Sequence, residues 1–276
     1  MELSGNYFEY DGVASREFGL IFANVETDRL NSIAGSIEPD RMFNKQGNKS
    51  HFVRYDEAGK HMTFDAEIVT EDGGCLDSHT MRMVKQWLFY RNGFQKLYID
   101  YVCHEDDVTT ETINNETKRL YLNCIFINPQ IIEGNGGVVG YKFTVECDSA
   151  LAWQDAASYR YSLGNGATGT ATLTLNVDSD IDGYIYPKVT VQMGSSGGDI
   201  VIVNTSDDSS RQTAFTGLSA GTTFTMNGDG VNYISGDNYS KFSKRNFIRL
   251  RSGQNTISVK GNISVITFEF QNRRYL

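Results

Sequence analysis

The chain has 276 residues, enough for one large or two ordinary domains that each bury a core. Hydrophobic residues make up 39% of it and glycine occupies 27 positions, which is typical of a globular protein rich in turns. No apolar run approaches the roughly 20 residues that span a bilayer. The start, MELSGNYFEY, has no apolar segment of the kind found in secretory signals, so we expect no membrane insertion.

The charge is unevenly distributed along the chain. Residues 1–155 contain 25 acidic and 14 basic side chains, a net charge of −11. Residues 156–276 contain 9 acidic and 11 basic side chains, a net charge of +2. Because affinity for nucleic acid depends on basic surface that contacts phosphates, we expect no specific binding of DNA.

Alternation of apolar and polar residues dominates the sequence and predicts β-strands. In chain order the expected strands are Tyr7–Tyr10, Leu20–Val25, Met62–Val69, Lys96–Val102, Leu120–Ile127, Tyr141–Cys147, Thr170–Val177, Lys188–Met193 and Asp199–Asn204. Pairs such as Asp72-Gly73 and Asn227-Gly228 mark the turns between them. Helices do not alternate with strands, which excludes a doubly wound α/β fold.

One segment predicts a helix, DSHTMRMVKQWLFYRNG. Asp77 or Ser78 can cap its start, and the pair Asn92-Gly93 supplies its end. Four residues form one apolar stripe along it, namely Met81, Val84, Trp87 and Leu88.

A change of composition near residues 155–169 predicts a domain boundary. The stretch QDAASYRYSLGNGATGT is small, polar and glycine-containing, and every cysteine, histidine and tryptophan precedes it. We expect a first domain over residues 1–155 and a second over 156–276. The polar stretch His104–Lys118 is typical of a long hairpin tip.

The C-terminal stretch Ser252–Leu276 predicts two strands joined at Lys260-Gly261-Asn262. The apolar phase changes at Ile266, which indicates either a β-bulge or a strand covered on both faces. A strand at this position can cover an edge of a sheet. The residues beyond it, Arg273, Arg274 and Tyr275, are either a solvated tail or an interface anchor, since Arg and Tyr are enriched at interfaces.

Two patterns resemble catalytic or metal-binding motifs. Gly194–Gly198 (GSSGG) matches G-x-S-x-G around Ser196, but no histidine follows His104, so a hairpin loop is favoured. Asp178–Gly183 matches the start of a calcium loop whose twelfth position is Val189 instead of Glu.

The histidines His51, His61, His79 and His104 have no metal-ligand spacing. The cysteines Cys75, Cys103, Cys124 and Cys147 form no CxxC motif and are expected to be reduced and mostly buried. We therefore expect no enzyme, no cofactor and no metal.

Six segments taken in order resemble the distal tail proteins of siphophages. Residues 8–22 (FEYDGVASREFGLIF), 92–99 (NGFQKLYI) and 143–153 (FTVECDSALAW) resemble the first domain of that family. Residues 185–191 (IYPKVTV), 215–218 (FTGL) and 253–261 (GQNTISVKG) resemble its second domain. The likeness spans nearly the full length of the chain.

The resemblance implies a mainly β protein with one helix. Its N-terminal β-sandwich-like domain closes a ring, usually of six copies, and its C-terminal domain is a galectin-like jelly roll. The ring joins the tail tube protein to the tail-tip, tail-fibre or receptor-binding proteins and leaves a channel for DNA. The resemblance also implies a place in the virion tail tip, after synthesis in the cytoplasm of a bacterial host.

The second part departs from sugar-binding galectins, because it contains neither His nor Trp. An alternative from another class is a carbohydrate-binding adhesion module that acts on host cell-surface glycans. Such a module would use exposed aromatic side chains of the second part, namely Tyr184, Tyr186, Tyr233 and Tyr239.

Overall fold

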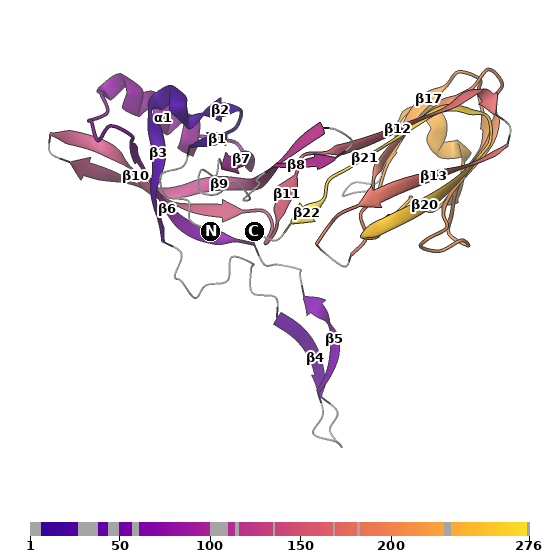
Figure 1. Ribbon diagram of the computed structural model, residues 1–276, viewed down its shortest axis with the longest axis horizontal. Helices are drawn as coiled ribbons and strands as arrows, with labels where there is room; N and C mark the ends of the chain where they lie inside the picture. The colour runs from indigo at the N-terminus through magenta and orange to yellow at the C-terminus, as the bar shows by residue number, and fades with distance from the viewer. Residues whose placement is uncertain are drawn as a thin grey trace. The chain divides into compact units, whose positions relative to one another are not determined.

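The computed structural model describes residues 7–26, 38–43, 50–56, 61–99, 110–113, 116–134, 136–167, 169–180, 183–228 and 233–274. The chain forms two compact units: Met1–Gln154 together with Arg274–Leu276, and Asp155–Arg273. Antiparallel strands dominate both (Figure 1), which confirms the mainly β fold. In the part that the structure describes, no helix is long and apolar enough to cross a membrane.

The first unit is built on one ten-stranded sheet. Its main path runs β2-β1-β7-β9-β10-β6-β3; β8 and β11 also pair with β9, and β22 pairs with β11. The strands are β1 (Phe8–Tyr10), β2 (Val13–Ala14), β3 (Leu20–Glu26), β6 (Thr63–Thr70), β7 (Gln95–Ile99), β8 (Thr110–Ile113), β9 (Glu116–Gly134), β10 (Gly137–Cys147), β11 (Ala152–Gln154) and β22 (Arg273–Arg274). Two further strands, β4 (Glu38–Phe43) and β5 (Ser50–Asp56), pair only with each other.

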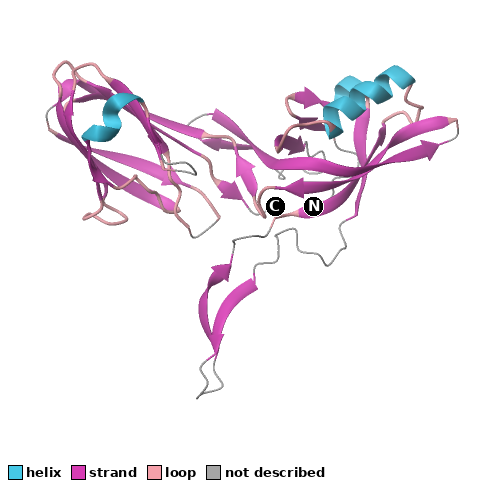
Figure 2. Ribbon diagram, turned by 180° about the vertical axis from the view of Figure 1, so that it is seen from behind, coloured by secondary structure: helices cyan, strands magenta, loops and turns pink. Residues whose placement is uncertain are grey.

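The predicted helix is confirmed as α1 (Ser78–Phe89), and its N-cap is Asp77. The Asp77 carboxylate accepts hydrogen bonds from the backbone N–H groups of His79 and Thr80, which would otherwise lack a partner at the helix start. The helix lies along one face of the sheet (Figure 2). It buries Val84, Trp87 and Leu88 there. The short 3-10 helix η1 (Ser15–Phe18) contributes to the same unit.

The second unit is a sandwich of two five-stranded antiparallel sheets. One has the order β12 (Ala157–Ala167), β21 (Ile263–Phe270), β14 (Lys188–Met193), β17 (Thr223–Asn227) and β18 (Tyr233–Ile234). The other has the order β13 (Thr170–Val177), β20 (Gly253–Lys260), β15 (Gly198–Asn204), β16 (Gln212–Leu218) and β19 (Phe242–Arg245). The 3-10 helix η2 (Gly236–Lys241) lies between β18 and β19. Inward-facing residues of both sheets form one continuous core.

Residues 157–167, expected to be a polar break, form the strand β12 instead. Ala157 lies opposite Phe270 and Tyr161 lies opposite Ile266, so the segment pairs along β21. Tyr159, Tyr161 and Leu163 alternate inward and pack against the core. The small and polar residues between them are the outward-facing half of the strand, which is why the composition alone suggested a linker.

The two predicted C-terminal strands exist as β20 and β21, but they lie in different sheets of the sandwich. The chain turns from one sheet to the other at Gly261, whose φ is 124°. Ser264 is the extra residue of a β-bulge, because Met193 pairs with Ile263 while Gln192 pairs with Val265. This bulge explains the change of phase.

The expectation that the terminal strand covers a sheet edge is wrong for β21. This strand lies inside its sheet, with β12 on one side and β14 on the other. Its inward-facing side chains Ile266, Phe268 and Phe270 belong to the buried core between the two sheets.

Candidate interaction surfaces

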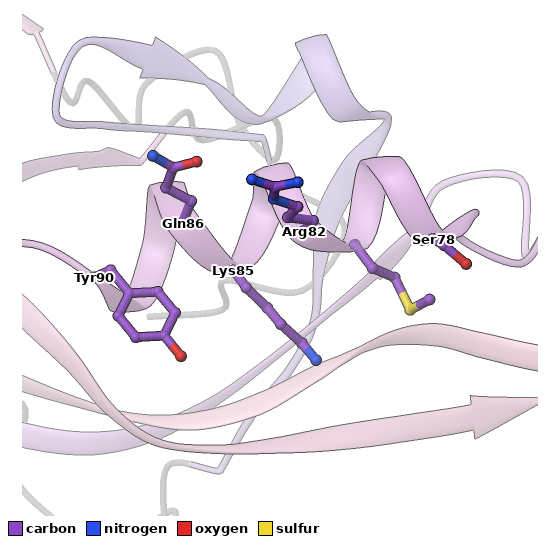
Figure 3. Close-up of a pocket in the computed structure, with 6 residues that line it drawn as sticks. Ser78, Arg82, Lys85, Gln86 and Tyr90 are labelled. Carbon is purple, nitrogen blue, oxygen red and sulfur yellow. The ribbon is translucent and has the colours of Figure 1, made fainter.

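The helix α1 is flanked by a groove of about 520 Å³. The residues that line it project from successive turns of the helix and from its C-terminal end (Figure 3), namely Ser78, Met81, Arg82, Lys85, Gln86 and Tyr90. We call this set the α1 surface. Tyr90 follows the last helical residue and is 78% exposed. The Lys85 ammonium lies 5.9 Å from the centre of the Tyr141 ring.

The chemistry of the α1 surface suits docking of another protein better than catalysis. It combines two cationic side chains, an exposed aromatic ring and a methionine, and Arg, Tyr and Met are enriched in protein interfaces. None of the lining residues is a carboxylate, a histidine or a cysteine. Its positive charge contrasts with the net charge of −11 of residues 1–155.

This surface was not predicted from the sequence. The pattern that located the helix also locates its outward face, because residues three and four positions apart lie on the same side. Arg82, Gln86 and Tyr90 have that spacing. What the pattern does not reveal is whether a neighbouring element covers this face.

The expected interface residues at the C-terminus are only partly described. Arg273 and Arg274 form β22, and Arg274 is buried, with 7% of its surface exposed. The Arg273 carbonyl oxygen accepts hydrogen bonds from the Asp180 N–H at 3.0 Å and from Ser179 Oγ at 3.2 Å. These two arginines are therefore in a hydrogen-bonded strand instead of a solvated tail. Tyr275 lies outside the described residues.

The tyrosine set of the second unit is partly covered by arginines. The Arg249 guanidinium lies 3.8 Å from the centre of the Tyr184 ring, and Arg251 Nη2 donates to the Tyr184 hydroxyl at 2.6 Å. Asp207 holds both arginines, with N–O distances of 2.7 and 3.0 Å. The hydrogen bond to Asp207 raises the pKa of Arg249. One face of Tyr184 is thus occupied by a guanidinium.

The other tyrosines of this set differ in exposure. Tyr239 is 55% exposed, and the Arg245 guanidinium lies 5.1 Å from its ring centre. Tyr233 is 43% exposed, whereas Tyr186 is half-buried. Since a sugar needs an open ring face on which to stack, the more exposed Tyr239 and Tyr233 are better platforms than Tyr184.

The GSSGG motif connects β14 to β15, which lie in different sheets. The expected hairpin is therefore wrong, and the motif is a crossing between the two layers of the sandwich. The Asn262 amide donates to both the carbonyl and the hydroxyl oxygen of Ser196. An amide donor cannot act as the base that a serine nucleophile needs.

The remaining motifs do not assemble a site among the described residues. No group of three or more His, Cys, Asp or Glu side chains lies close enough there to hold a metal ion. Asp182 of the aspartate-rich loop and the side chains of His51 and His104 lie outside the described residues. His61 Nε2 lies 3.9 Å from Glu146 Oε1, and His79 is exposed at the start of α1.

The described residues form a β-rich fold with a cationic surface along its helix. Comparison with known protein families identifies the class of protein. The chain belongs to the phage tail proteins: residues 3–149 match the phage tail protein N-terminal domain and residues 151–270 match the phage tail C-terminal domain. It is therefore a tail component of a phage particle.

Solved structures with a similar fold include a phage hub protein and chains of a phage baseplate. The Dit (gp 19.1) protein of phage SPP1, described as a paradigm of the hub adsorption apparatus in phages that infect Gram-positive bacteria, matches with a TM-score of 0.64. Its sequence identity is 9%, over 97% of this chain and 98% of that one. A search among curated protein sequences found no match.

Chains of the phage P2 baseplate in its activated conformation also match. The structure with calcium has a TM-score of 0.52 and covers 97% of both chains, and the structure with strontium has a TM-score of 0.53 and covers 97% of this chain and 98% of that one. Both are 9% identical in sequence. The resemblance to distal tail proteins stated from the sequence is confirmed by the family match and by this shared fold.

Proposed function

We propose that this protein is the distal tail hub of a siphophage, in which six copies form a ring around a channel for DNA. The ring joins the tail tube protein on one side to the tail-tip, tail-fibre or receptor-binding proteins on the other. The observation that carries the proposal is the match of both units, in order and over 97% of the chain, to the fold of a protein described as a hub. The role is structural, without catalysis and without a cofactor.

Charge supports a channel through which DNA passes without being bound. A basic wall would hold phosphates through the release of counterions, whereas an acidic wall repels the duplex. Residues 1–155 supply a net charge of −11, and we assign this domain to the ring. The domain of residues 156–276, with a net charge of +2, would face outward and dock other tail proteins.

Two surfaces are proposed as contacts within this assembly. The α1 surface has the composition of an interface and the charge to meet an acidic neighbour. Arg273, Arg274 and Tyr275 form the second, with the two arginines fixed in β22 next to β11. The glycan-binding alternative has less support, because the Arg249 guanidinium lies over the Tyr184 ring, where a sugar would have to stack.

Light scattering and negative-stain electron microscopy of the purified full-length chain test the proposal. We expect rings with six times the chain mass of 30.9 kDa, either alone or after addition of the tail tube protein. A protein that remains monomeric under both conditions would overturn it. Surface lysines and arginines lining the central hole would contradict the assignment of the acidic wall, even in a ring of six.

The α1 surface is tested by Arg82→Glu combined with Tyr90→Ala. If this surface contacts a neighbour, the double variant should lose ring formation or binding of a tail protein while its circular dichroism spectrum is unchanged. Arg160→Glu is the matched control for ring formation, because it reverses an exposed charge in the domain that the proposal places outside the ring. Equal behaviour of both variants would remove α1 from the interface.

A further inference from the structure

Two buried cysteines of the first unit lie directly opposite each other. Cys124 in β9 pairs with Cys147 in β10. The Asp148 N–H donates to the Asn123 carbonyl oxygen at 2.9 Å, and the Cys147 N–H points away from β9 to the Met62 carbonyl oxygen, also at 2.9 Å. The pair is therefore of the non-hydrogen-bonded type, in which opposite residues have their side chains closest together.

This pairing has the geometry that a disulfide needs. Opposite Cα atoms at such positions lie about 4.5 Å apart, within the range of about 4.4–6.8 Å that disulfides span. Both side chains point into the same core, where Cys124 has 0% and Cys147 has 2% of its surface exposed. Both are free thiols.

Their surroundings make the reduced pair unreactive while the unit stays closed. Burial raises the pKa of the Cys124 thiol well above its usual range, and the hydrogen bond with Cys147 acts in the same direction. Since the thiolate is the nucleophile, a buried thiol with a raised pKa reacts slowly. Cys147 is the last residue of β10, and a series of bends follows it, so the pair can become accessible when this strand end opens.

We propose that Cys124 and Cys147 are a modification site, at which a cross-strand disulfide forms once the phage tail protein has left the reducing cytoplasm. The oxidant is a small-molecule disulfide. The Cys147 thiolate attacks one of its sulfurs and releases one thiolate, which gives a mixed disulfide. The Cys124 thiolate then attacks the Cys147 sulfur and releases the second thiol, so that two protein thiols become one disulfide and one small disulfide becomes two thiols.

The bond would close the hairpin of β9 and β10, the two strands with the longest pairing in the first unit. A crosslink stabilises a fold chiefly by restricting the unfolded chain. For the loop between Cys124 and Cys147 we expect a rise in the melting temperature of the first unit by roughly 5–10 °C. The particle would thus gain stability outside the cell.

The test uses the full-length protein carrying Cys75→Ser and Cys103→Ser, so that only the two core thiols remain. Reduced protein is incubated with oxidised glutathione, and the intact mass and the melting temperature are measured over time. We expect a loss of about 2 Da without a glutathione adduct, together with the rise in melting temperature. Trypsin cleaves at Arg119, Lys142 and Arg160, so the two cysteines fall in separate peptides that stay joined until a reductant is added.

Variants separate the proposal from a structural role of the thiols. Cys147→Ala and Cys124→Ala in the same background should show no mass loss and no response of the melting temperature to oxidised glutathione. Two unlinked thiols after prolonged oxidation, including oxidation of briefly unfolded and refolded protein, would overturn the proposal. So would a disulfide that forms only between two chains, which a non-reducing gel reveals.

Discussion

The indole Nε1 of Trp87 donates a hydrogen bond to the carbonyl oxygen of Tyr10 at 2.8 Å, although the two residues are 77 positions apart. Trp87 also stacks on Phe8, with ring centres 5.6 Å apart, and on Phe18 at 5.1 Å. One side chain therefore fixes α1 to β1 and to η1. The position of the α1 surface depends on this contact.

We expect Trp87→Phe to lower the free energy of unfolding by about 1–3 kcal/mol, because the buried Tyr10 carbonyl loses a donor. Trp87→Ala should cost about 3–5 kcal/mol, since it also leaves a cavity. Urea unfolding followed by circular dichroism measures both. Met83→Ala is the control on the same helix, with a side chain that is 44% exposed. A loss as large in this control as in Trp87→Phe would refute the explanation.

Asp207 provides a second test, in the other unit. Its side chain is 2% exposed and pairs with Arg249 at 2.7 Å and Arg251 at 3.0 Å. Asp207→Ala leaves two guanidinium groups without their shared carboxylate, so we expect a loss of about 2–4 kcal/mol in the free energy of unfolding.

The control for Asp207 is an ion pair of the same length at the surface. Lys188 and Glu269 are also 2.7 Å apart, but their side chains are 47% and 38% exposed. Lys188→Ala should therefore cost less than about 1 kcal/mol. Chemical denaturation of both variants gives the comparison, and similar losses would mean that burial does not decide the strength of these pairs.

Gly261 sits where the chain crosses between the sheets of the second unit. Its φ of 124° disfavours any residue with a side chain, and a Cβ added there would lie 2.5 Å from the Asp199 carbonyl oxygen. Gly261→Ala should lower the free energy of unfolding by about 2–4 kcal/mol. Gly169→Ala is the control, because a Cβ at Gly169 meets no atom within 4 Å. If the melting temperature changes equally in both variants, backbone strain at Gly261 does not determine the stability of this unit.

The N-cap of α1 predicts a dependence on pH. The hydrogen bond from the Thr80 N–H lowers the pKa of Asp77 below its ordinary value of 3.8. A carboxylate with a lowered pKa stabilises the folded state fully above its unfolded pKa, and this contribution is lost as the pH falls through the folded pKa. The difference in melting temperature between the wild type and Asp77→Ala should therefore be full above about pH 5 and should disappear near pH 2.

Asp77→Asn is the matched control, since an amide oxygen also caps a helix but does not titrate. The difference between Asp77→Asn and Asp77→Ala should stay constant over the same range of pH. A difference between the wild type and Asp77→Ala that does not change on acidification would show that the Asp77 charge has no part in the cap.

The sequence predicted elements well where one face of a strand is strictly apolar. The strands β13 and β14 were predicted with their observed bounds, because Leu173 and Leu175, like Val189 and Val191, alternate with polar residues. It failed for β12, where Gly164 and Gly166 resemble a turn. It also missed β16 and β17, although Phe224 and Met226 of β17 alternate with polar residues.

Relationships between distant segments could not be predicted from local patterns. β20 and β21 follow each other along the chain, and the sequence predicted both strands. The structure shows that they lie in separate sheets, which no local pattern indicates. The exposed tyrosines suggested stacking platforms, whereas Arg249 reaches Tyr184 from 65 positions later in the sequence. Likewise, Cys124 and Cys147 lie opposite each other only because of the register between β9 and β10.

The last prediction concerns folding of the second unit alone. Every strand of its two sheets and every residue of its core lies within Asp155–Arg273. We therefore propose that a fragment of residues 155–273 folds by itself, with a cooperative thermal transition and a β-type circular dichroism spectrum. A fragment of residues 169–273 is the control: it lacks β12, so it exposes the edge of β21 and should unfold or aggregate. A non-cooperative transition in the longer fragment would show that this unit needs residues outside Asp155–Arg273 for stability.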